Sequence, residues 1–148
     1  MQKLDFGEAL ELIYKRDSRY DRDAYHFLRD ALDYTIKQRK KAKAGTGHVT
    51  GQQLLEGIRN YALKQYGPMV PVVLGYWGIQ KCEDFGEMVF NLIRMRIFGK
   101  TESDSLDDFK GGFTFHEAFV VPFLPDNAPN PARPPSHPRP EEYQKRPI

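Results

Sequence analysis

Residues 50–68 of the chain read TGQQLLEGIRNYALKQYGP, and this stretch carries the start and stop signals of one complete helix. Thr50 can accept a hydrogen bond from the amide of Gln53, whose side chain can reach back to the Thr50 amide, as in a capping box. Apolar side chains then recur every three or four residues, which predicts one buried helical face. A glycine and a proline close the stretch in the usual order. We therefore predict a helix over 51–66.

The same helical spacing of apolar residues continues on both sides of this stretch. No alternating run is long enough to predict a strand. The folded part is therefore predicted to be mainly α, a single compact domain of about five helices over residues 1–121. Besides 51–66, the predicted helices are one near 6–14, one from Asp21 or Asp23 to the basic run before Gly45, a short one over 71–78, one over 83–98, and a last short one that Thr114 and Glu117 cap.

The last part of the chain, residues 122–148, has a different composition. It holds nine of the eleven prolines, which fix φ and remove amide donors, so we predict a disordered, solvated tail with polyproline II character. Two P-x-x-P patterns, at 131–134 and 135–138, accompany Arg133 and Arg139. Segments of this kind dock into aromatic grooves, and as bare composition they also serve as solubilising tails.

Charge and cysteine content bound the class of protein. The 148 residues include 22 basic and 20 acidic side chains, a net charge of +2, so a charged partner must be recognised by a local patch. The single cysteine, Cys82, has no partner for an internal disulfide, which predicts a reducing, cytoplasmic location. The N-terminal residues carry charges where a signal peptide is apolar, and the apolar run 70–79 is too short to span a bilayer. We expect no membrane partner.

The strongest local charge is a run of five basic residues within 37–43, without an acid among them. Basic residues at the C-terminal end of a helix complement its dipole, so a solvated helix end is one interpretation. A patch that binds phosphates of RNA or DNA is the other. The glycines that follow fit neither a P-loop nor a dinucleotide fingerprint, but the start of the next helix can attract an anion. The candidate anion or nucleic-acid site is Lys37, Arg39, Lys40, Lys41, Lys43, His48 and Thr50.

Catalytic patterns are absent from the sequence. The four histidines do not have the spacing of a zinc site, and Cys82 lacks an adjacent base, so we predict no metal, no cofactor and no catalytic residue. His26 is expected to be a partly buried structural imidazole, and Trp77 is expected to fill the core together with Phe85 and Phe90. An enzyme with a site assembled from distant residues stays open as a third interpretation, with His48, Cys82, Asp84 and Trp77 as the first place to look.

Three segments carry a resemblance to a known group of proteins. They are HVTGQQLLEGIRNYALKQYGPM at 48–69, WGIQKCEDFGEMVFNLI at 77–93 and KTESDSLDDFKGGFTFHEAF at 100–119. In these segments the chain resembles a family of short bacterial proteins that has no assigned activity. The resemblance spans about residues 4–119 and leaves the proline-rich end outside. It implies one compact domain and no particular chemistry.

These observations favour a non-catalytic cytoplasmic domain for protein interaction or regulation. Its expected partner is another protein or a second copy of the chain. The alternative is an RNA-binding or ribosome-associated protein that uses the basic helix end at 37–43. A small enzyme is the third hypothesis.

Overall fold

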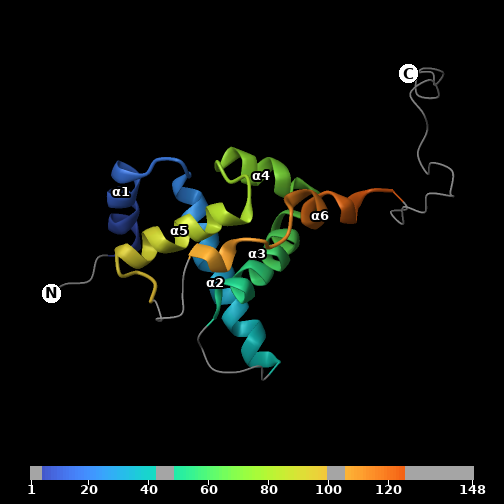
Figure 1. The fold of residues 1–148 in the computed structure, drawn as a ribbon, viewed down its shortest axis with the longest axis horizontal. Coiled ribbons are helices and arrows are strands. Elements are labelled where there is room, and N and C mark those ends of the chain that lie inside the picture. The colour runs from blue at the N-terminus through green and yellow to red at the C-terminus, as the bar shows by residue number, and fades with distance from the viewer. Residues whose placement is uncertain (1–4, 43–48, 100–105, 126–148) are drawn as a thin grey trace, which may run out of the picture.

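The chain folds as an arrangement of α-helices in a computed structural model, which describes residues 5–42, 49–99 and 106–125 (Figure 1). No strand occurs in these ranges, which confirms the predicted mainly α class. The elements in chain order are α1 (Phe6–Arg16), α2 (Arg22–Lys41), α3 (Gly51–Tyr66), the 3-10 helix η1 (Gly67–Met69), α4 (Val70–Tyr76), α5 (Cys82–Arg94), η2 (Leu106–Phe109), α6 (Phe115–Phe119) and η3 (Val121–Phe123).

Side-chain caps determine where four of these helices begin. Asp5, Asp21 and Thr114 each accept a hydrogen bond from a backbone amide in the first turn of α1, α2 and α6. The capping box predicted for α3 is confirmed. The Gln53 amide donates to Thr50 Oγ1 at 3.2 Å, and the Thr50 amide donates to Gln53 Oε1 at 3.0 Å. Local hydrogen bonding thus defines the start of these helices.

The core forms around α2 and α3, which lie side by side, with α5 packed across them and against α1 (Figure 1). At the contact between α2 and α3, Gly57 faces the side chain of Thr35. The Thr35 hydroxyl is buried and donates to the carbonyl of Ala31 at 2.7 Å, so it has no unsatisfied polar atom at the interface. The largest fully buried side chains include Tyr20, Tyr25, Phe85, Phe119, Leu28 and Leu55.

The end of α5 differs from the prediction. Helical periodicity predicted a helix up to Phe98, but α5 ends at Arg94. Arg96 adopts φ 59°, and the Ile97 amide donates to the carbonyl of Leu92 at 3.0 Å, which together are the marks of a Schellman turn. Glycine usually occupies the left-handed position of this turn, and arginine there gives no stop signal in the sequence.

The predicted proline-rich tail lies almost wholly outside the described ranges, because residues 126–148 are not among them. Its first residues are described, and Val121–Phe123 forms a 3-10 turn with a proline in its first turn, where extended chain was predicted. The predicted boundary at residue 121 stays a prediction. Within the described part of the chain, no helix has the length and apolar character that a bilayer crossing requires.

Candidate functional site

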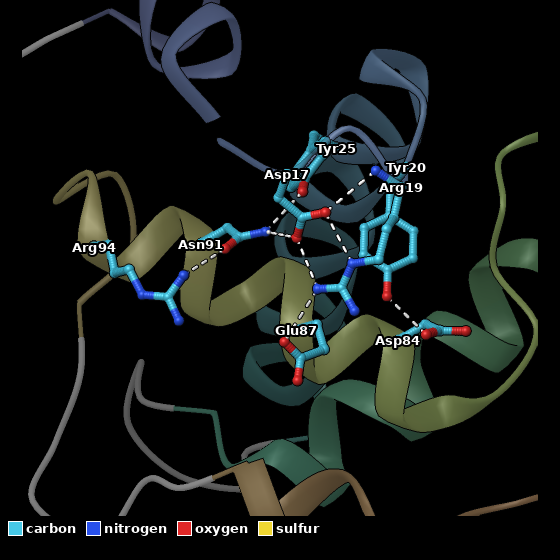
Figure 2. A network of polar contacts seen from close by, with 8 residues as sticks. All are labelled: Asp17, Arg19, Tyr20, Tyr25, Asp84, Glu87, Asn91 and Arg94. Carbon is cyan, nitrogen blue, oxygen red and sulfur yellow. Dashed lines mark hydrogen bonds and ion pairs between the residues drawn. The ribbon is translucent and has the colours of Figure 1, made fainter. Parts of the chain in front are cut away.

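A network of polar side chains fastens the connection between α1 and α2 to α5. Figure 2 shows its members: Asp17, Arg19, Tyr20, Tyr25, Asp84, Glu87, Asn91 and Arg94. The Asp17 carboxylate accepts from Arg19 Nε at 2.8 Å and Nη2 at 2.7 Å. Asn91 is buried, and its Nδ2 donates to Asp17 Oδ2 and to the Tyr25 hydroxyl, both at 3.0 Å. Arg94 donates to the amide oxygen of Asn91 at 2.7 Å, so every polar atom of that amide group has a partner.

The second half of the network lies at the start of α5. The Tyr20 hydroxyl donates to one oxygen of Asp84 at 2.7 Å. The other oxygen of Asp84 accepts from the backbone amides of Gln80 at 2.8 Å and Lys81 at 3.1 Å. One carboxylate, in the first turn of α5, therefore accepts from the amide of the N-cap residue Lys81 and holds the preceding connection in place.

In this network the pKa of Asp17 is lowered and the pKa values of Tyr20 and Tyr25 are raised, so all three move farther from neutral pH. Hydrogen bonds from Arg19 and Asn91 hold the pKa of Asp17 well below its usual range despite its partial burial. Burial raises the pKa of Tyr25 to about 12, and burial with a hydrogen bond to an acid raises the pKa of Tyr20 further. A general acid or base needs a pKa near the working pH. These side chains are therefore arranged to hold the fold together, and none of the three is poised for proton transfer.

A second feature is an open hollow of about 310 Å³, into which α2 and the ends of α3 and α4 contribute side chains. Its lining residues are Asp23, His26, Phe27, Asp30, Tyr61, Gln65, Tyr66 and Trp77. Phe27 is central to the aromatic part. Its ring centroid lies 5.3 Å from that of Trp77, 5.5 Å from Tyr61 and 6.2 Å from Tyr66. Tyr66 and Trp77 also meet edge to face at 5.9 Å. The four rings form one continuous cluster.

The charged groups of the hollow are acidic. Asp23 and Asp30 are both exposed, and among the described lining residues there is no lysine or arginine. Arg29 Nε lies 3.9 Å from the Asp30 carboxylate, at the outer limit of an ion pair. Asp30 lines the same hollow as Tyr61, and burial and then the charge of Asp30 raise the pKa of Tyr61. Aromatic faces beside carboxylates are the chemistry that binds ammonium and guanidinium groups.

Four of the residues predicted to bind anions, Lys37, Arg39, Lys40 and Lys41, lie near the C-terminal end of α2. Lys37, Lys40 and Lys41 are exposed and follow helical spacing, so they share one face, and none has an ion pair within the described ranges. Arg39 is half-buried. Thr50 caps α3 with its side chain. Lys43 and His48 lie outside the described residues.

The described residues named for an enzyme site, Cys82, Asp84 and Trp77, make different contacts and do not form one site. Trp77 lines the hollow, whereas Asp84 belongs to the polar network. The Cys82 thiol is buried, donates to the carbonyl of Phe113 at 3.2 Å, and has a pKa that burial raises to about 11. A thiol with so high a pKa is a poor nucleophile at neutral pH. His48 lies outside the described residues.

One prediction about a single side chain was wrong. His26 was expected to be partly buried but is exposed, and its ring lies against Phe6 with centroids 5.1 Å apart. Trp77 is 7% exposed, which confirms its predicted place in the core, whereas its neighbour Tyr76 is 80% exposed. Adjacent residues on a helix point about 100° apart, so one can be buried while the next faces solvent.

Tyr76 belongs to an exposed apolar stripe. Met69, Val72 and Tyr76 are 53%, 63% and 80% exposed and share one side of η1 and α4. In the chain, this stripe lies between two residues of the hollow, Tyr66 and Trp77. Contiguous exposed apolar side chains often mark surfaces that bind other molecules.

Sequence reasoning did not find the hollow. One signal was present, because Asp23, His26, Phe27 and Asp30 recur at helical spacing and so form a stripe on α2. The stripe alone does not predict that residues of α3 and α4 complete the site.

No protein-family model matches the chain, and no curated protein or solved structure matches it at a significant level. The resemblance to short bacterial proteins thus stays a prediction. The geometry of the hollow and of the basic helix end is what bears on function.

Proposed function

We propose that the chain is a non-catalytic, cytoplasmic protein-interaction domain, and that the hollow binds an arginine- or lysine-bearing segment of a partner protein. The observation that carries the proposal is the pair of exposed carboxylates, Asp23 and Asp30, beside the four-ring cluster. The single cysteine suits a reducing compartment.

Arginine fits the hollow better than lysine. A guanidinium group is planar, so it can stack on an aromatic face while its edge donates two hydrogen bonds to a carboxylate. An ammonium group is more strongly hydrated and gains less from an aromatic face. Tyr61, Trp77 and Asp30 all line the hollow, so an aromatic surface and a carboxylate lie at the same site.

Met69, Val72 and Tyr76 offer a partner an exposed apolar surface. In the sequence these residues lie between Tyr66 and Trp77, which line the hollow. Interfaces commonly combine a few aromatic or arginine anchors with surrounding apolar contacts. A partner that presents an arginine followed by apolar residues would use both surfaces.

Asp30→Asn is expected to weaken the binding of a short arginine peptide by about three- to fivefold at low salt, because it removes an exposed ion pair worth up to about 1 kcal/mol. The single tryptophan of the chain, Trp77, lies in the hollow, so its fluorescence reports binding directly. The matched control is Asp33→Asn, which removes the same charge from an exposed position of α2 outside the hollow.

The same peptide with glutamine in place of arginine should produce no saturable change in fluorescence. Equal losses of affinity in Asp30→Asn and Asp33→Asn would mean that the peptide responds to the general charge of α2. The hollow would then not be the binding site.

A second candidate function is RNA binding by the basic end of α2. The observation that favours it is the shared face of Lys37, Lys40 and Lys41, which is exposed and carries no ion pair within the described ranges. Three lysines on one face can contact successive phosphates, and such binding weakens steeply with salt.

Lys40→Glu with Lys41→Glu is expected to lower the affinity for single-stranded RNA at least about tenfold at low salt. For the unchanged chain, three phosphate contacts give a slope of about −2 for log affinity against log salt concentration. Filter binding across a salt series measures both quantities. The control is Lys15→Glu with Arg16→Glu, which reverses the basic pair in the last turn of α1. If both double variants bind RNA as the unchanged chain does, the basic end of α2 is only a solvated helix end.

A further inference from the structure

The hollow also has a candidate ligand within the same chain. We propose that the tail segment 131–140, through Arg133 or Arg139 and the adjoining prolines, docks into the hollow formed by Asp23, Asp30 and the aromatic cluster. This inference rests on the proposed function, because it names the segment that occupies the proposed binding site when no partner is bound.

The composition of the segment matches the lining of the hollow. Residues 131–140 read PARPPSHPRP, with five prolines, two arginines and no acid. Proline rings pack on aromatic faces, and proline-rich segments are recognised in aromatic-lined grooves because they lose little entropy on binding. Each arginine is followed directly by a proline, so a guanidinium group and an apolar ring arrive together.

Charge complementarity favours this segment over the rest of the tail. The hollow presents two exposed carboxylates, and the segment presents two arginines. The residues next to it, at 126–130 and 141–142, include acids that the carboxylates of the hollow would repel. The basic pair at 145–146 follows two acids and has one adjoining proline.

The tail is long enough for Arg133 and Arg139 to reach the hollow. From Pro125, the last described residue, Arg133 is eight residues away and Arg139 is fourteen. At about 3.1 Å per residue these lengths span about 25 Å and about 43 Å. A folded unit of about 120 residues has a radius of gyration of about 14 Å. The described chain ends just after α6, which contacts α3 and α4, two of the elements that supply residues to the hollow.

A ligand tethered to the same chain lowers the apparent affinity of the hollow for a partner. A short tether gives a ligand an effective concentration in the millimolar range at its binding site. Even a weakly bound tail then competes with every external basic segment. The tail thus sets a threshold of affinity that a partner has to exceed.

The test compares the full chain with two double variants of the same length. Arg133→Gln with Arg139→Gln removes the proposed ligand, and Lys145→Gln with Arg146→Gln removes the same charge from the end of the tail. The measurement is the affinity of the short arginine peptide, followed by Trp77 fluorescence. We expect the peptide to bind the first variant about threefold more tightly than it binds the unchanged chain or the second variant.

Equal affinity in all three chains would overturn the tail inference and leave the proposed function standing, because the peptide would still bind. Absence of peptide binding in all three would overturn the proposed function. Adding Asp30→Asn to the unchanged chain and to the first variant is expected to shrink the threefold difference between them. A difference that persists would show that the tail competes elsewhere than in the hollow, which also overturns the inference.

A second readout uses no peptide. Acrylamide should quench Trp77 more strongly in the first double variant than in the unchanged chain, at every protein concentration. A difference that grows with protein concentration would show that the tail of one copy binds another copy, contrary to docking within one chain.

Discussion

Gly57→Ala is expected to lower the free energy of unfolding by about 3 kcal/mol. A Cβ on Gly57 would lie 2.8 Å from the Cβ of Thr35 and still closer to the Thr35 hydroxyl. Thr35 cannot turn away without cost, because it is buried and its hydroxyl donates to a carbonyl of its own helix. The helices α2 and α3 would have to separate where Gly57 faces Thr35. Urea unfolding followed by circular dichroism measures the loss.

The matched control for this prediction is Gly75→Ala. Gly75 also lies inside a helix, α4, but a Cβ there would have no heavy atom within 4 Å. Alanine is the better helix former, so this variant should be as stable as the unchanged chain or up to about 1 kcal/mol more stable. If the two variants unfold at the same urea concentration, the close contact between α2 and α3 does not limit the residue at 57.

Asp17→Asn is expected to cost about 2 kcal/mol of folding stability at pH 7. The pKa of Asp17 is lower in the folded chain than in the unfolded chain, where it is about 3.9. The ionised carboxylate therefore stabilises the fold fully above the unfolded pKa, and this contribution is lost as the pH falls from about 4 towards the folded value. The side chain is 14% exposed, so solvent screens its interactions only in part.

Unfolding measured from pH 7 down to pH 2 tests the sign as well as the size of this effect. The difference in stability between the unchanged chain and Asp17→Asn should be constant near neutral pH and narrow below about pH 4. Glu11→Gln is the control, because Glu11 also pairs with an arginine, Arg22, but is 59% exposed. It should change stability little, and salt should remove most of the change. A difference for Asp17→Asn that widens in acid would contradict the assigned pKa.

The local parts of this fold were predictable from the sequence. The capping box at Thr50 and the N-cap at Asp21 depend on residues only a few positions apart, so they appear in the sequence directly. The early end of α5 was not predictable, because Arg96 takes a left-handed conformation that usually belongs to glycine. The surrounding structure, and not the local preference of arginine, determines that turn.

The candidate site was predictable only in fragments. The basic run 37–43 is visible in the sequence, and its described lysines are exposed as a solvated or binding surface requires. The hollow is not visible, because its carboxylates come from α2 and its other rings from α3 and the end of α4. Only tertiary packing brings the ring centroids of Trp77 and Phe27 to 5.3 Å from each other. The exposed position of Tyr76 beside a buried Trp77 likewise depends on which side of α4 faces the core.

The helix α2 carries both charged surfaces, and their spacing has a consequence for binding. Asp30 and Lys41 are eleven residues apart, about 16 Å along the helix axis at 1.5 Å per residue. That separation is about twice the Debye length at physiological ionic strength, so neither charge strongly perturbs the other there. If both proposed sites bind as described, occupation of one end of the helix would leave the affinity of the other end unchanged. A cationic and an anionic partner could then bind to α2 at the same time.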